Sequence, residues 1–76
     1  MLDAKVLAII PEVKHPDAIQ IARALAKASG ETVNYHDVAD SLDRLHGQHL
    51  VEYNYAVRWF DGWVVYKLPD GAPAPQ

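Results

Sequence analysis

The chain contains no cysteine, so it can form neither a disulfide framework nor a thiolate metal site. It also lacks a long apolar run, because the longest, Val6 to Ile10, is far too short to span a bilayer. The first residues show no basic segment leading into an apolar one, so we expect no signal peptide. These absences favour a cytoplasmic protein.

Basic side chains are in the minority, since seven Lys and Arg against ten Asp and Glu give a net charge of −3. A free-standing nucleic-acid-binding domain is more often basic, so this balance argues against that function. A glycine-rich phosphate loop is missing, and no nucleophile stands in a recognised catalytic setting. We therefore expect no enzymatic activity and no cofactor. We also expect no metal site, because no acidic or cysteine ligand completes a set with His36, His46 and His49.

The 76 residues, half of them hydrophobic, suffice for one small domain. We assign residues 1–70 to that domain. Residues 71–76, with the sequence GAPAPQ, offer nothing to pack, and we expect them to form a flexible tail.

Two helices are predicted in the first half of the chain. Apolar residues at near-helical spacing indicate a first helix from Leu2 to about Ile10, which Pro11 stops. A capping-box spacing opens a second helix that should run from about Asp17 to Ser29. Gly30 directly after Ser29 is a typical C-terminal stop.

A third helix should begin after Asn34, which is a good N-cap. Val38, Leu42 and Leu45 then recur at spacings of four and three residues, which gives a narrow apolar stripe. The stretch from Gly47 to His49 ends the helix. Either of these two residues could supply the positive φ that such an end commonly needs.

A β-hairpin is predicted around Asp61-Gly62, a dipeptide that favours a two-residue type I′ turn. Pairing outward from this turn sets Phe60 opposite Trp63, Trp59 opposite Val64, Arg58 opposite Val65 and Val57 opposite Tyr66. The core face would then carry Tyr55, Val57, Trp59, Val64, Tyr66 and Leu68. The opposite face would carry Ala56, Arg58, Phe60, Trp63, Val65 and Lys67.

Three helices followed by a hairpin form the pattern of a winged helix-turn-helix domain, which belongs to the α+β class. The pattern also allows a short third strand near Thr32-Val33. This fold is often used to place one helix in the DNA major groove with a β-hairpin wing beside it.

The residues that carry this pattern resemble the winged-helix domain of PadR-like transcriptional regulators. The resemblance covers roughly residues 3 to 68 and rests on "AIQIARALAKASG", "VNYHDVADSLDRLHGQHLVEY" and the closing "VVYKL". The glycine that the family has before "LV" is His49 here, and its usual C-terminal dimerisation helix has no counterpart after Leu68. The resemblance implies a DNA-binding regulator of transcription.

The leading hypothesis is sequence-specific binding of double-stranded DNA by the third helix and the wing. Polar side chains placed on the outer helix face and on the wing could reach bases or phosphates; they are Tyr35, His36, Ser41, Arg44, Arg58 and Lys67. Arg44 is the best candidate for a guanine or phosphate contact. The carboxylates of Asp37, Asp40 and Asp43 oppose this use, because they lie on or beside the face that phosphates would approach.

The alternative hypothesis is a protein-interaction module on the same scaffold. A protein partner would bind Asp37, Asp40 and Asp43 of the helix, together with the wing aromatics Phe60 and Trp63. Those two aromatics could equally form a cross-strand pair that stabilises the tip of the hairpin. We also expect a homodimer, formed either through the first helix or through Phe60 and Trp63.

Overall fold

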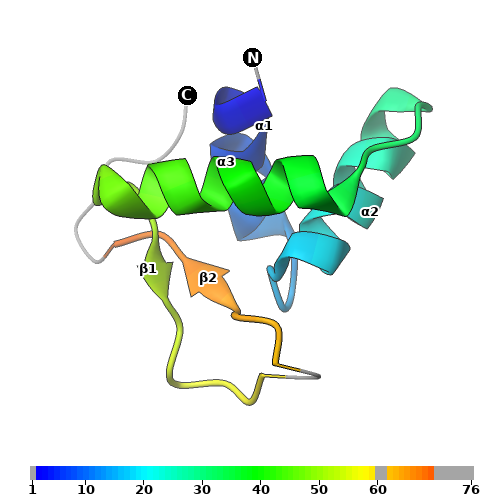
Figure 1. Ribbon diagram of the computed structural model, residues 1–76. Helices are drawn as coiled ribbons and strands as arrows, with labels where there is room; N and C mark the ends of the chain where they lie inside the picture. The colour runs from blue at the N-terminus through cyan, green and yellow to red at the C-terminus, as the bar shows by residue number, and fades with distance from the viewer. Residues whose placement is uncertain (1, 60–61, 70–76) are drawn as a thin grey trace.

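In the computed structural model three helices are followed by a two-stranded antiparallel hairpin (Figure 1). The structure describes residues 2–59 and 62–69. In chain order the elements are helix α1 (Leu2–Ile9), the 3₁₀ turn η1 (Ile10–Glu12), helix α2 (Ala18–Ser29), helix α3 (Tyr35–Gly47), strand β1 (Glu52–Tyr53) and strand β2 (Tyr66–Lys67). This is the predicted α+β layout of a winged helix. The tail expected at residues 71–76 lies outside the described residues.

The predicted beginnings of α2 and α3 are confirmed by their caps. The Asp17 carboxylate accepts a hydrogen bond of 2.8 Å from the backbone N–H of Gln20. The Asn34 side chain likewise accepts one of 2.9 Å from the N–H of His36. Each cap satisfies one of the backbone donors that the first turn of a helix leaves without a partner. At the other end of α2, Gly30 takes the left-handed conformation, with φ 75°.

The C-terminal end of α3 uses His49, rather than Gly47, for the left-handed position, with φ 61°. Two backbone bonds close this end, from His49 N–H to the His46 carbonyl at 3.0 Å and from Leu50 N–H to the Leu45 carbonyl at 2.9 Å. This is the Schellman arrangement, which normally has glycine where His49 stands. The helix is therefore ended by hydrogen bonds at the cost of some backbone strain.

The core lies where the three helices and the hairpin meet, with α3 running across α1 and α2 (Figure 1). Each helix contributes most of the apolar stripe that its spacing predicted, and the hairpin adds further residues. Leu2 and Ile9 of α1 are only partly buried, and Ala28, at the end of the stripe on α2, is exposed. The buried hydrophobic residues are Val6, Ile10, Ala18, Ile21, Ala22, Leu25, Val38, Leu42, Leu45, Val51, Val65 and Tyr66.

The predicted register of the hairpin is wrong. Glu52 lies opposite Lys67 and Tyr53 opposite Tyr66, so Tyr66 pairs four residues earlier on the first strand than expected. The Asn54 side chain explains the shift, because it accepts a 3.0 Å bond from the N–H of Ala56 and turns the chain directly after β1. The indole N–H of Trp59 then donates to the Asn54 carbonyl at 2.8 Å.

The predicted core face of the hairpin is wrong in part. Tyr66 is buried as expected, but the Tyr55 side chain is 79% exposed, and Val65, assigned to the outer face, is buried. Within the described residues Thr32 and Val33 form no strand. The proposed Phe60–Trp63 pair and the type I′ turn each need a residue outside the described ranges, although Gly62 does have a positive φ of 76°.

The hairpin is joined to the helices through the connector between η1 and α2. The N–H of Tyr66 donates to the Pro16 carbonyl at 2.9 Å, on the side of β2 away from β1. On the side facing β1, the N–H of Asn54 donates to the Val65 carbonyl at 2.7 Å. The second strand is therefore hydrogen-bonded along both of its edges.

Candidate binding surface on helix α3 and the hairpin

The outer side of α3 carries three exposed carboxylates, Asp37, Asp40 and Asp43, which we call the acidic face. Their spacing of three residues places them on neighbouring turns, opposite the buried stripe of Val38, Leu42 and Leu45. The acidic face therefore points to solvent, as the sequence predicted. A negative potential along α3 attracts cations and repels phosphates.

Arg44 and Ser41 face α1 and are held there by Asp3. The Asp3 carboxylate accepts 2.8 and 3.3 Å bonds from the Arg44 guanidinium and a 2.6 Å bond from the Ser41 hydroxyl. Ser41 is completely buried, so its assignment to the outer, DNA-contacting face is wrong. Ser41 is three residues after Val38 and four before Leu45, so helical spacing already places it beside the apolar stripe. What spacing does not reveal is its pairing with Asp3 in the first turn of α1.

This three-residue cluster also sets the charge of its members. The hydrogen bonds from Arg44, and next that from Ser41, lower the pKa of Asp3 to about 2. The same carboxylate raises the pKa of Arg44 above its ordinary value. Both groups are therefore ionised at neutral pH. The positive charge of Arg44 is offset by Asp3, although the Arg44 side chain remains 55% exposed.

Tyr35 and His36, at the first turn of α3, are exposed as predicted and lie against each other with ring centroids 4.2 Å apart. Trp63 approaches Tyr35 edge-on, with ring centroids 5.5 Å apart. Trp63 is only partly exposed and packs against the core. It therefore serves to fix the hairpin to the N-terminal end of α3, and it is not the free aromatic tip that the alternation predicted.

The two basic side chains predicted for the wing differ in their surroundings. Arg58 is exposed, within the segment that connects the strands. The Lys67 ammonium lies 3.9 Å from the Glu52 carboxylate on the facing strand. Of the predicted DNA-contacting residues, Tyr35, His36 and Arg58 are therefore accessible to a ligand. Arg44 and Lys67 are each in an ion pair with an acidic side chain.

A group of ring side chains, Tyr53, Tyr55 and Trp59, lies at the other end of α3, and we call it the aromatic cluster. Tyr53 packs edge-on against Tyr55 and Trp59, with ring centroids 6.3 and 6.2 Å apart. His46 of α3 stacks on Tyr53 at 4.2 Å with an interplanar angle of 7°. Since His46 is one turn beyond Asp43, the cluster adjoins the C-terminal end of the acidic face.

The sequence pattern missed the exposed part of this cluster, because strict alternation assigned Tyr55 and Trp59 to the core. One signal could have found it. Asparagine is a frequent turn residue, and Asn54 between two tyrosines marks the place where β1 ends.

No family model, curated protein or solved structure matches the chain, so its resemblance to PadR-like regulators stays a prediction. Among the residues that the structure describes, no helix has the length and apolar character needed to cross a membrane.

Proposed function

We propose that the chain is a protein-interaction module that binds a basic segment of a partner protein through the acidic face and the aromatic cluster. The observation that carries this proposal is the exposure of Asp37, Asp40 and Asp43 on the outer side of α3. In a DNA complex of the usual kind this side of the helix would enter the major groove. Here it would bring three carboxylates towards the phosphates.

The ion pairs strengthen the argument. Ordinary DNA affinity comes largely from Lys and Arg side chains that neutralise phosphates. Arg44 is bound to Asp3, and Lys67 lies near Glu52, so each would have to exchange a carboxylate for a phosphate. Such an exchange gains less than placing a free cation against the backbone of DNA.

The aromatic cluster supplies the apolar part of a protein-binding surface. Tyr and Trp are over-represented among the residues that dominate binding energy at protein interfaces. The Tyr55 ring is largely exposed and lies 5.4 Å from the ring of Trp59, measured between centroids. A lysine or arginine side chain from a partner could lie over such rings while its charge meets the acidic face.

Binding of DNA is the second candidate, and the arrangement of the helices favours it. Helix α2 leads through a short turn into α3, and the hairpin lies beside α3 (Figure 1). The exposed Tyr35 and His36 stand at the N-terminal turn, which contacts base edges in helix-turn-helix complexes. A regulator of this kind would use these two residues with Arg58.

Nuclear magnetic resonance titration at physiological salt separates the two functions. Three probes are used. The first is a peptide rich in lysine and arginine that also contains a short leucine-rich segment, the second is an acidic peptide of equal length, and the third is a mixed-sequence DNA duplex. We expect the basic peptide alone to shift the amide signals of the acidic face and of Tyr55. Shifts at Tyr35, His36 and Arg58 with the duplex, and none with the basic peptide, would support DNA binding instead.

A charge-removing variant provides the control for specificity. Asp37→Asn, Asp40→Asn and Asp43→Asn in one chain should weaken binding of the basic peptide at least tenfold, because most of the attraction is removed. Glu31→Gln, at an exposed acid outside the acidic face, should bind like the parent. Stronger binding of the duplex by the triple variant, with unchanged peptide binding, would contradict the proposal.

A further inference from the structure

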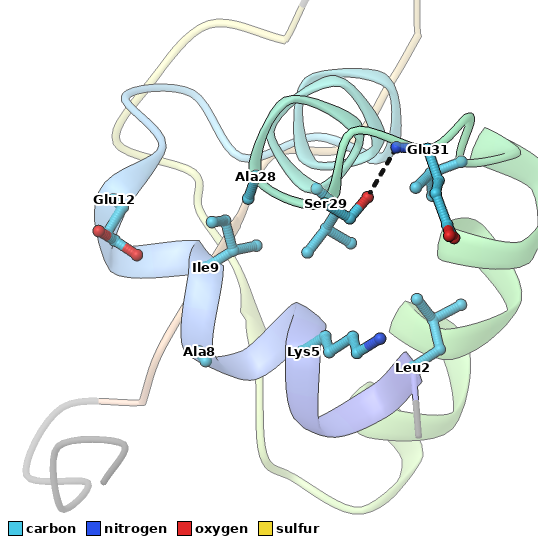
Figure 2. A pocket seen from close by; sticks show the side chains of 10 residues that line it. Leu2, Lys5, Ala8, Ile9, Glu12, Ala28, Ser29 and Glu31 are labelled. Carbon is cyan, nitrogen blue, oxygen red and sulfur yellow. Dashed lines mark hydrogen bonds between the residues drawn. The ribbon is translucent and has the colours of Figure 1, made fainter.

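A groove runs between α1 and the C-terminal end of α2 (Figure 2). It has a volume of about 350 Å³. Leu2 and Ile9 of α1 (Figure 2), together with Leu25 of α2 and Val33 of the following loop, line the groove and make much of its surface apolar. Both α1 side chains are only partly buried, which leaves apolar surface open to solvent.

The rim of the groove carries a regular exposed row along α1 and η1. Lys5, Ala8 and Glu12 are all exposed and follow each other at spacings of three and four residues. Lys5 and Ala8 lie on one face of α1, and Glu12 follows in η1, so the rim has a cation at one end, a methyl group in the middle and a carboxylate at the other end. Lys5 and Glu12 are roughly 12 Å apart along the chain axis, because α1 rises about 1.5 Å per residue and η1 about 2 Å.

The row formed by Lys5, Ala8 and Glu12 is complementary to the same row of a second copy that runs antiparallel to it. In a two-fold dimer residue i of one copy meets residue j of the other, and residue j meets residue i. An antiparallel pairing centred near Ala8 sets each Lys5 opposite the Glu12 of the other copy, which forms the same ion pair twice. The small Ala8 side chains at the axis let the two helices approach closely, so that Leu2 and Ile9 become covered.

We propose that this groove receives α1 of a second copy and that the chain forms an antiparallel, two-fold homodimer through Leu2, Lys5, Ala8, Ile9 and Glu12. The acidic face and the aromatic cluster stay accessible, because they lie on α3 and the hairpin. A contact built from one short helix is at the small end of stable interfaces. The dimer therefore forms in the micromolar range, and each dimer presents two copies of the binding surface.

Sedimentation-velocity ultracentrifugation of the whole chain, from low micromolar to near-millimolar concentration, tests the proposal. We expect the wild type to shift from monomer to dimer over this range. Ala8→Lys places two like charges at the axis and should remove dimerisation, whereas Arg23→Ala, on the exposed side of α2, should leave it unchanged. A wild type that stays monomeric throughout overturns the proposal, and so does an Ala8→Lys variant that dimerises like the parent.

A charge exchange tests the antiparallel pairing itself. Lys5→Glu alone and Glu12→Lys alone should each weaken the dimer roughly tenfold, because each creates two like-charge contacts. The double variant Lys5→Glu/Glu12→Lys restores both ion pairs and should return the dimer to near wild-type strength. Since the exchanged side chains are exposed, unchanged circular dichroism will show that the variants fold. A double variant no stronger than the single ones overturns the pairing.

Discussion

At the scale of single residues, the end of α3 shows how one backbone position limits stability. His49 holds φ 61° in a place where glycine would be free of strain. Gly30 holds φ 75° at the end of α2 without this cost. Both helix ends thus require a residue with positive φ, which is a glycine after α2 and a histidine after α3.

Substitution at these two positions should give opposite results. His49→Gly is expected to raise the free energy of unfolding by about 1 kcal/mol, because it relieves a left-handed non-glycine residue. Gly30→Ala should lower it by about the same amount; the space around Gly30 is open, so only backbone conformation changes. Urea unfolding measures both. A less stable His49→Gly variant would mean that the His49 side chain outweighs the strain.

The Asp3 carboxylate should make stability depend on pH in the acidic range. Its pKa is about 2 in the folded chain, against an ordinary value of 3.8. Because the folded pKa is the lower one, its stabilising contribution is complete above about pH 4 and is lost as the pH falls through about 2. Asp3→Asn should remove this part of the pH dependence. An NMR titration that places the Asp3 pKa near 3.8 would contradict the prediction.

At the scale of elements, helices were predictable and the hairpin was predictable only in outline. Helices α2 and α3 have side-chain caps at their beginnings, and Pro11 follows α1; all three have apolar residues at helical spacing. Local sequence therefore determines their bounds to within about one residue. The register of the hairpin depends instead on a competition between alternation and the turn at Asn54. The turn at Asn54 prevails because the Asn54 side chain accepts a hydrogen bond from the backbone N–H of Ala56 and the Asn54 carbonyl accepts one from the indole N–H of Trp59.

The candidate surface could be predicted to a similar extent. The carboxylates of the acidic face follow from helical spacing on α3. The pairing of Arg44 and Ser41 with Asp3 does not, because it joins residues about forty positions apart in the chain. No local pattern contains such a contact, which arises only when α1 packs on α3.

Tyr53 should be the residue that holds the connecting segment of the hairpin in place. It contacts the rings of His46, Tyr55, Trp59 and Tyr66. Tyr53→Ala is therefore expected to cost about 2–3 kcal/mol and to speed amide hydrogen exchange in residues 54–59. Tyr55→Ala removes a mostly exposed ring and should cost less than about 0.5 kcal/mol while weakening partner binding. Equal losses in the two variants would refute this division of roles.

At the scale of the whole molecule, the ion pairs limit how the chain could respond to DNA. Arg44 and Lys67 are each near a carboxylate. Of the basic side chains expected near a DNA contact surface on α3 and the hairpin, this leaves Arg58 and, on α2, Arg23 and Lys27 to meet phosphates. Any DNA binding by one copy should therefore show a slope of log affinity against log salt no steeper than about −3. Fluorescence anisotropy with a labelled duplex measures this slope.

Variants separate the basic residues in the same assay. Arg58→Ala should weaken residual DNA binding, whereas Arg44→Ala should leave it unchanged and lower the stability of the fold. A steep slope that becomes shallower in Arg44→Ala would show that Arg44 leaves Asp3 for the phosphates. That result would favour the DNA-binding function over the protein-binding one.

The bonding of β2 on both sides has a consequence for how the protein behaves when concentrated. A strand at the edge of a sheet offers unpaired N–H and C=O groups to other chains, and this is a common start of aggregation. Here the Tyr66 N–H is already taken by the Pro16 carbonyl. Proline has no N–H with which to continue a ladder, so Pro16 also blocks further pairing at that point. The connector between η1 and α2 thus shields β2 from strand-to-strand growth into fibres.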